Sequence, residues 1–326
     1  MKSGLPAHAA RTVLLVARDE ILTRTLRLPS THPKEINNLV AYRLPQELPY
    51  AIAEIVYHAD TLQVNPDGYA QVGVLWTLRK NMESKLASLK EFGIEIDEAI
   101  PSTQGLLFYF LRLRAADPTL PSRVFLAALA AKQSELALVD GEKVLFSRSA
   151  KHGIEHVFHE KDAFVQECKN FLQAAEKEGW VKPEALCVLG PAEEREAAMP
   201  VFSGITDLPI HWPQDLAGVE LPVQGADFAA RVGASSGPWE SPASLLPTEI
   251  REERDLGKKA RLARHGLLLS ACFMIFSLGG LALDLTAKER RRDALLSEAG
   301  NLSPQTKEVL AIAEAMKLRE TLAAHA

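Results

Sequence analysis

The most pronounced hydrophobic pattern in the chain is an uninterrupted apolar run near its C-terminal end. Residues 266–283 read GLLLSACFMIFSLGGLAL and carry no charge. As a helix rising 1.5 Å per residue, this run would be ~27 Å long, close to the ~30 Å hydrocarbon core of a bilayer. Basic clusters flank both of its ends. We therefore predict a transmembrane helix over residues 266–285, with a buried core helix of a soluble domain as the alternative.

Before this run, two kinds of pattern alternate and predict α/β structure. Apolar runs such as TVLLVA and alternating segments such as ILTRTLRL are typical of strands, whereas apolar residues recurring every three or four positions are typical of helices. Asn-Pro-Asp-Gly at residues 65–68 predicts a turn, because proline presets φ and glycine supplies a positive φ. In the first part we predict strands over residues 12–17, 21–28, 53–64, 69–78 and 94–100, and helices over residues 33–44, 80–92 and 102–113, with Phe92 facing inward.

A linker with the sequence AADPTLPS at residues 115–122 separates this part from a second α/β unit. Asp140-Gly141 lies between two strand patterns and predicts a hairpin. We predict strands over residues 124–129, 135–139, 143–148, 185–189 and 208–212, and helices over residues 162–178, 192–201 and from 226 onward.

The patterns thus divide the chain into six parts. A Ser- and Pro-rich linker follows the second unit, and a charged helix leads into the apolar run. Ser303-Pro304 predicts the start of a separate last helix, whose apolar face suits a helix–helix or coiled-coil contact. The predicted parts are two subdomains (1–117 and 118–235), a linker (236–247), a juxtamembrane helix (248–265), the span (266–285) and a helical tail (286–326).

Composition and charge limit the partners. A net charge of −5 argues against nucleic acid as the main partner. Cys168, Cys187 and Cys272 show no CxxC spacing, which fits a reducing compartment, and no apolar leader opens the chain.

Six basic residues precede the span and four follow it, which favours a cytoplasmic N-terminal domain and a periplasmic tail. A basic run without acids is expected to lie against anionic headgroups; it contains Lys258, Lys259, Arg261 and Arg264.

Candidate chemistry is sparse. His152, Glu155, His156 and His159 could share a helix face as metal ligands do, or could belong to a partly exposed polar loop. The sequence contains no GxxxxGK[ST], GxGxxG or GxSxG motif. We therefore predict no catalytic, metal-binding or cofactor-binding residues.

The order of the elements carries a family resemblance. Segments such as ILTRTLRLPSTHPKEINNLVAYRLPQELPY, ELALVDGEKVLFSRSAKHG and ADFAARVGAS resemble, in order and spacing, the PilM family of actin-like type IV pilus assembly proteins and the cytoplasmic domain of type II secretion GspL proteins. The resemblance covers residues 11–234. It implies a two-subdomain, ribonuclease H-like actin fold, here degenerate and shortened at its N-terminal end.

A second resemblance begins at Ser244. SLLPTEIREERDLGKKARLARHG followed by a span is similar to the start of the PilN family, in which Asn-Leu-Leu-Pro precedes a basic stretch and a transmembrane helix. Ser244 replaces the Asn, whereas Leu245, Leu246 and Pro247 match. In that family the segment docks into PilM. The resemblance therefore implies that Leu245, Leu246 and Pro247 bind a partner surface, in their own domain or in that of a neighbour.

The chain departs from the family at the three turns that hold nucleotide in an actin-like protein. The first Asp-x-Gly turn has no counterpart, the second position reads AALAAKQSE, and the third reads Gly-Pro-Ala-Glu-Glu from residue 190. Phosphate binding by backbone N–H groups favours glycine at such turns. We therefore expect a non-enzymatic inner-membrane scaffold that needs no cofactor.

The resemblance implies a secretion or pilus ATPase, PilN/PilO-like or GspM-like proteins, and a second copy of the chain as partners. Two alternatives stay open: an actin-like ATPase, and an unrelated single-span membrane protein.

Overall fold

The computed structural model describes residues 12–213, 215–216, 219–220, 225–237 and 243–323, some of them by their backbone alone. The chain divides into two units, Met1–Arg251 and Glu252–Ala326. Each unit is described by itself.

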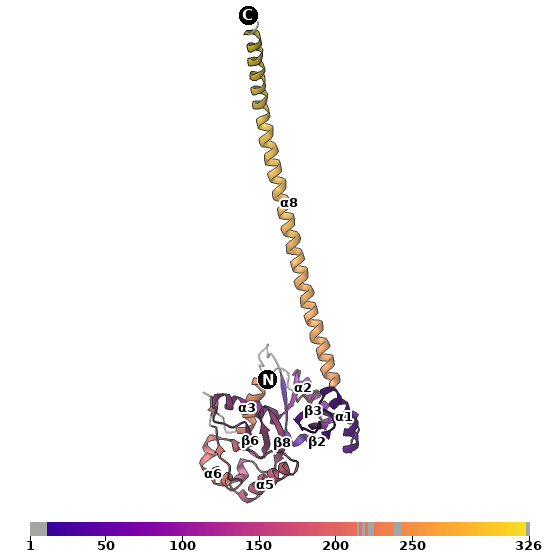
Figure 1. The fold of residues 1–326 in the computed structure, drawn as a ribbon, viewed down its shortest axis with the longest axis vertical. Helices are drawn as coiled ribbons and strands as arrows, with labels where there is room; N and C mark the ends of the chain where they lie inside the picture. The colour runs from indigo at the N-terminus through magenta and orange to yellow at the C-terminus, as the bar shows by residue number, and fades with distance from the viewer. Residues whose placement is uncertain (1–11, 214, 217–218, 221–224, 238–242, 324–326) are drawn as a thin grey trace. The chain divides into compact units, whose positions relative to one another are not determined.

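A five-stranded mixed sheet forms the centre of the first unit (Figure 1). Its strand order is β10-β9-β6-β7-β8. Strands β6, β7 and β8 form an antiparallel meander, β9 is parallel to β6, and β10 is parallel to β9. The Asp140-Gly141 hairpin is present, and Gly141 has a φ of 61°. The strands are β6 (Arg123–Leu129), β7 (Ser134–Asp140), β8 (Lys143–Ala150), β9 (Ala185–Leu189) and β10 (Ile210–His211).

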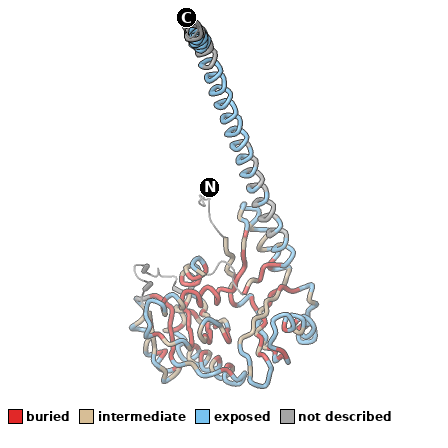
Figure 2. The backbone as a smooth tube through the Cα atoms, turned by 45° about the horizontal axis from the view of Figure 1, so that its top comes forward, coloured by how far each residue is buried: buried red, intermediate tan, exposed pale blue. Residues whose placement is uncertain are grey.

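Helices cover both faces of this central sheet, and side chains of β6 pack against the helices on each face. Phe125 and Leu129 pack toward α5 (Lys161–Lys177) and α6 (Arg195–Ser203), whereas Val124 and Leu126 belong to the core formed with other helices on the opposite face. Those helices are α3 (Ser102–Ala116) and α7 (Gly225–Ser236). Burial is concentrated in these layers (Figure 2).

The N-terminal part holds two smaller sheets. Strand β1 (Val13–Val16) pairs in parallel with β5 (Glu98–Pro101), and a three-stranded antiparallel sheet of order β2-β4-β3 is inserted between them in sequence. The inserted elements are η1 (Arg18–Glu20), β2 (Leu22–Leu28), α1 (Pro33–Glu47), η2 (Ile52–Glu54), β3 (Ile55–Val64), β4 (Ala70–Leu78) and α2 (Arg79–Glu91). Helix α1 covers one face of the three-stranded sheet through Ile36, Val40 and Leu44.

Remaining short elements link these layers. They are α4 (Ile154–Val157), η3 (Ala192–Glu194), β11 (Asp215–Leu216) and β12 (Val219–Glu220).

Three local predictions were wrong. Helix α1 continues through Pro45 to Glu47 rather than ending before the proline. The strand predicted over residues 94–100 begins only at Glu98. Phe92 is 81% exposed, because α2 ends at Glu91 and the chain turns at Phe92.

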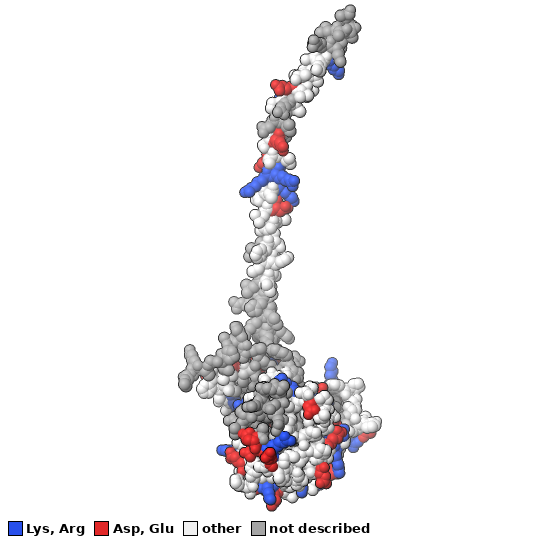
Figure 3. Space-filling model, turned by 90° about the vertical axis from the view of Figure 1, so that its left-hand side faces the viewer, with Lys and Arg blue, Asp and Glu red and all other residues white. Residues whose placement is uncertain are grey.

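The second unit is helical. Helix α8 (Thr248–Ala323) begins at the end of the first unit and is continuous through Pro304, so the separate helix predicted to start at Ser303-Pro304 does not exist. Charged side chains gather over one zone of α8, where Lys288 pairs with Asp284 at 2.8 Å and Arg292 with Asp293 at 3.2 Å (Figure 3).

Within the described residues, no helix is long and apolar enough to cross a membrane. Within the predicted span, Leu267, Leu268, Ala271 and Ile275 lie outside the residues whose side chains are described. The structure therefore does not confirm the predicted span over residues 266–285.

Candidate functional site

The segment predicted to bind a partner lies buried in the first unit. Leu245 is fully buried, Leu246 is 6% exposed, and Pro247 is also buried. The backbone N–H of Leu245 donates a 2.7 Å hydrogen bond to the carbonyl oxygen of Ala99 in β5. Leu245 therefore meets β5 through the backbone as well as through its side chain.

Both leucines belong to one hydrophobic cluster, here called the leucine cluster. It consists of the buried side chains of Val16, Ile21, Met82, Ala99, Leu245 and Leu246. Burying two leucines contributes about 3–6 kcal/mol before the cost of ordering the segment is subtracted. The segment is thus held by apolar contacts to β1, α2 and β5 within its own domain.

The start of α8 adds polar contacts next to this cluster. Arg79 pairs with Glu249 at 2.9 Å, and the N–H of Arg251 donates to the carbonyl oxygen of Pro247 at 3.0 Å. The Glu249 side chain is 70% exposed, so this ion pair contributes little on its own. The four basic residues predicted to face the membrane surface are in α8, but their side chains lie outside the described residues; they are Lys258, Lys259, Arg261 and Arg264.

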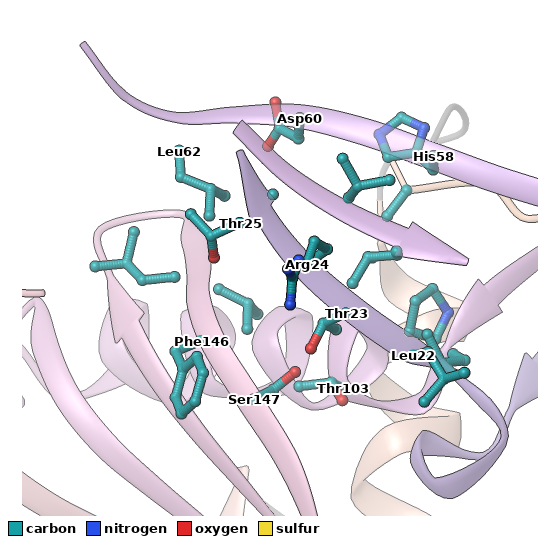
Figure 4. Close-up of a pocket in the computed structure, with 18 of the residues that line it drawn as sticks. Leu22, Thr23, Arg24, Thr25, His58, Asp60, Leu62, Thr103, Phe146 and Ser147 are labelled. Atoms are coloured by element: carbon teal, nitrogen blue, oxygen red, sulfur yellow. The ribbon is translucent and has the colours of Figure 1, made fainter. Parts of the chain in front are cut away.

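A cavity of about 1110 Å³ lies between the three-stranded sheet and β8 (Figure 4). Its walls include Thr25 of β2, Asp60 of β3 and Phe146 of β8, and Thr103 of α3 also lines it. Both β2 and β8 are terminal strands of their sheets. We call this space the β2–β8 cavity.

Arg18 is the buried cation of this cavity, at 5% exposure. Its Nε donates to Oγ of Ser147 at 2.9 Å, and one Nη donates to the backbone carbonyl of the same residue. Further bonds reach the carbonyl oxygen of Ile21 and, at 3.3 Å, Oγ1 of Thr23. Burial lowers the pKa of Arg18 to about 10, so the guanidinium stays charged at neutral pH.

Glu135 of β7 is partly buried, and its carboxyl lies near the start of α3. The hydroxyls of Ser102 and Thr103 donate to its two oxygens, the latter at 2.9 Å. Burial raises the pKa of Glu135, and the two hydroxyl hydrogen bonds and the charge of Arg18 only partly offset this effect. A carboxyl of the chain itself therefore occupies the space beside the first turn of α3.

The turns that would hold nucleotide in an actin-like protein are packed against other parts of the chain. At the β6–β7 turn, the carbonyl oxygen of Ala130 accepts a 2.9 Å bond from Ile154, and a Cβ at Gly153 would lie 2.5 Å from the backbone of the turn. After β9, a Cβ at Gly190 would lie 3.1 Å from the ring of Trp212.

Of the three histidines that could share a helix face, His152 is held by two carboxylates. His152 contacts Glu167 at 2.8 Å through Nδ1 and Glu160 at 3.2 Å through Nε2. The hydrogen bond to Glu167 is the main reason that the pKa of His152 is raised. Within the described part of the chain, no group of three or more His, Cys, Asp or Glu residues could hold a metal ion.

The sequence singled out the leucine segment, whose binding to a partner stays a prediction, but gave no indication of Arg18, Glu135 or Ser147. These residues become neighbours only when η1, β7 and β8 come together. The one feature of the sequence that could have drawn attention to Arg18 is the charged turn Arg18-Asp19-Glu20, which lies between two strand patterns.

Neither a protein-family model nor a curated protein sequence matches the chain. Among solved structures, it is similar to a PilM-PilN type IV pilus biogenesis complex, with 18% identity over 71% of this chain and 82% of that chain and a TM-score of 0.54.

Lower scores relate the chain to two other structures. One is the cytoplasmic domain of EpsL, an inner membrane component of the type II secretion system of Vibrio cholerae, with 13% identity, coverage of 72% and 76%, and a TM-score of 0.43. The other is a Bacteroides thetaiotaomicron protein with an actin-like ATPase fold and unknown function, with 11% identity, coverage of 68% and 73%, and a TM-score of 0.39. The similarity to the PilM-PilN structure shows that the chain shares the α/β fold of that structure, so the predicted α/β class is confirmed.

Proposed function

We propose that this chain is a non-enzymatic inner-membrane scaffold of a type IV pilus or type II secretion machine. In this proposal it couples a cytoplasmic assembly ATPase to periplasmic components. The observation that carries the proposal is the burial of Leu245 and Leu246 in the leucine cluster, directly before α8. One chain would then combine a PilM-like domain with the PilN-like segment that docks into it.

The membrane attachment rests on the sequence. Residues 266–283 carry no charge, and basic residues lie on both sides of them. In the proposed arrangement the first unit is cytoplasmic, residues 266–285 cross the inner membrane and residues 286–326 are periplasmic. Lys258, Lys259, Arg261 and Arg264 would face anionic lipid headgroups.

The proposed partners follow from the two resemblances. They are the assembly ATPase on the cytoplasmic side, PilN/PilO-like or GspM-like proteins in the membrane, and a second copy of the chain. Large apolar side chains on the last part of α8 suit helix–helix contacts, because Val309, Ile312 and Met316 are each more than half exposed.

The packing of the two turns supports a role without nucleotide. The contacts of Ala130 and Gly153 at one turn, and of Gly190 with Trp212 at the other, leave little room for phosphates. An actin-like ATPase is the competing function. Calorimetric titration of the full chain with Mg-ATP separates the two: the scaffold predicts no binding at micromolar concentrations, and micromolar affinity would favour the ATPase.

Enrichment of the tagged full chain from cross-linked native membranes tests the scaffold role. We expect a secretion or pilus ATPase and PilN/PilO-like or GspM-like proteins among the enriched proteins. The L245S/L246S variant serves as the control and should retain fewer of them. Recovery of no pilus or secretion component with the wild-type chain would refute the proposal.

A further inference from the structure

The turn Arg18–Glu20 lies between the leucine cluster and the β2–β8 cavity. On one side, Val16 and Ile21 flank Arg18 in sequence, and both are buried in the leucine cluster, at 1% and 2% exposure. On the other side, the turn contacts β8 of the central sheet. One short segment therefore contributes to both places.

The bonds of Arg18 tie these two sides together. Two of them end on Ser147 of β8, at its Oγ and its carbonyl oxygen, and one ends on the carbonyl oxygen of Ile21. A planar guanidinium holds several acceptors in fixed directions, which an ammonium group cannot do. The position of Ile21, which is part of the wall around Leu245 and Leu246, is thereby fixed relative to the central sheet.

Other polar bridges across the cavity are weaker. Thr25 donates to Glu178 at 2.9 Å and Lys143 donates to the carbonyl oxygen of Thr61, but both bridges are exposed to solvent. Exposed polar contacts compete with water and contribute little. Arg18 is buried, so its bonds cannot be replaced by water without a rearrangement.

The geometry assigns to Arg18 the role of a positioning residue for the docking of Leu245 and Leu246, acting through Ile21 and anchored on Ser147. The docking site of the leucine segment is then built by two parts of the domain rather than by the N-terminal sheets alone. The inference rests on the proposed function, because it concerns the same docked segment. Coupling of this kind is reciprocal, so release of the leucines should also loosen β8 around Ser147.

Amide hydrogen exchange of the full chain tests this role. The readout is the Leu245 amide, which is protected by its bond to Ala99. We expect Arg18→Lys to raise the exchange rate of this amide about tenfold, and Ser147→Ala to raise it less, because the carbonyl of Ser147 remains as an acceptor. In return, L245S/L246S should raise exchange in residues 145–149 of β8.

Two controls separate positioning from general destabilisation. Arg24→Lys alters an exposed ion pair with Glu47 at 2.8 Å and should leave the exchange rate of the Leu245 amide unchanged. The amide of Phe171, in the core of α5, should keep its protection in every variant.

Three outcomes would overturn the inference. The first is an exchange rate of the Leu245 amide that is the same in Arg18→Lys and Ser147→Ala as in the wild-type chain. The second is loss of Phe171 protection with Arg18→Lys while Ser147→Ala has no effect. The third is faster exchange of the residue-245 amide in L245S/L246S with no change of exchange in β8, which would agree with docking by the leucines but contradict the coupling. An unprotected Leu245 amide in the wild-type chain would instead contradict the docking and with it the proposed function.

Discussion

Truncating both docked leucines should release the segment without unfolding the first unit. Leu245 and Leu246 are 0% and 6% exposed, and Leu→Ala at buried sites costs about 2–5 kcal/mol each. The double variant L245A/L246A cannot lose more than the segment's own docking free energy, because undocking leaves the other core clusters in place. We therefore expect local release rather than global unfolding.

The size of the effect follows from the burial of these side chains. A loss of about 2.7 kcal/mol, which is less than the sum expected for two buried leucines, already raises the open population about 100-fold, since each 1.36 kcal/mol is a factor of ten. Trypsin cleavage after Arg251 is the readout, because the N–H of Arg251 donates to the carbonyl oxygen of Pro247, the residue directly after the docked leucines. Cleavage of L245A/L246A should accordingly be about 100-fold faster than that of the wild-type chain.

A matched control uses a leucine that is already exposed. Leu22 is 52% exposed, so Leu22→Ala should change stability by less than about 0.5 kcal/mol and leave cleavage unchanged. Equal cleavage rates for the wild-type chain and L245A/L246A would refute the reasoning, because they would mean that the leucine contacts do not hold the segment.

Three further predictions concern packing and pH. Gly233→Ala should destabilise the first unit by about 3 kcal/mol or more in urea unfolding, because its Cβ would lie 1.8 Å from the carbonyl oxygen of Gly105. The raised pKa of Glu135 means that the folded protein binds a proton more tightly there, so the wild-type chain should lose stability relative to E135Q as the pH rises above about 4.5 in pH-dependent melting. The raised pKa of His152 predicts that the advantage of the wild-type chain over H152Q is full below about pH 6.5 and declines as the pH rises through the folded-state pKa.

Each of these predictions has a contrary result. Ser235→Ala on the exposed side of α7 is the control for Gly233→Ala, and equal stability of the two variants would show that the helices can separate at no cost. A difference between the wild-type chain and E135Q that does not vary with pH would contradict burial of the carboxyl. A difference between the wild-type chain and H152Q that grows above pH 7 would have the wrong sign for a histidine stabilised by Glu167.

Local turn chemistry explains why much of the fold could be predicted from the sequence. The Asp140-Gly141 hairpin and the strand of residues 124–129 follow from patterns within a few residues, and both are present. Pro45 and Ser303-Pro304 were misjudged because proline is only a local signal, and neighbouring turns of α1 and α8 continue past it.

The site could be predicted only in part, because its polar centre depends on distant segments. Leu245 and Leu246 stand out as a leucine pair before a proline, and they are buried in the first unit, whereas their binding to a partner stays a prediction. Arg18 and Ser147 are 129 positions apart, and no periodicity relates them. Burial of an arginine also runs against the usual surface preference of this residue, so the pattern alone predicts an exposed turn.

The central claim is that the leucine segment docks in the domain of its own chain, and photo-cross-linking at position 246 tests it most directly. A diazirine-bearing leucine analogue replaces Leu246 in the full chain, and the cross-linked peptides are identified by mass spectrometry from living cells. Mixing isotope-labelled and unlabelled chains separates links within one chain from links between copies. The account predicts links within one chain to the peptides that contain Val16, Ile21 and Met82. Links only to another protein or to lipid, with none to these peptides, would contradict it.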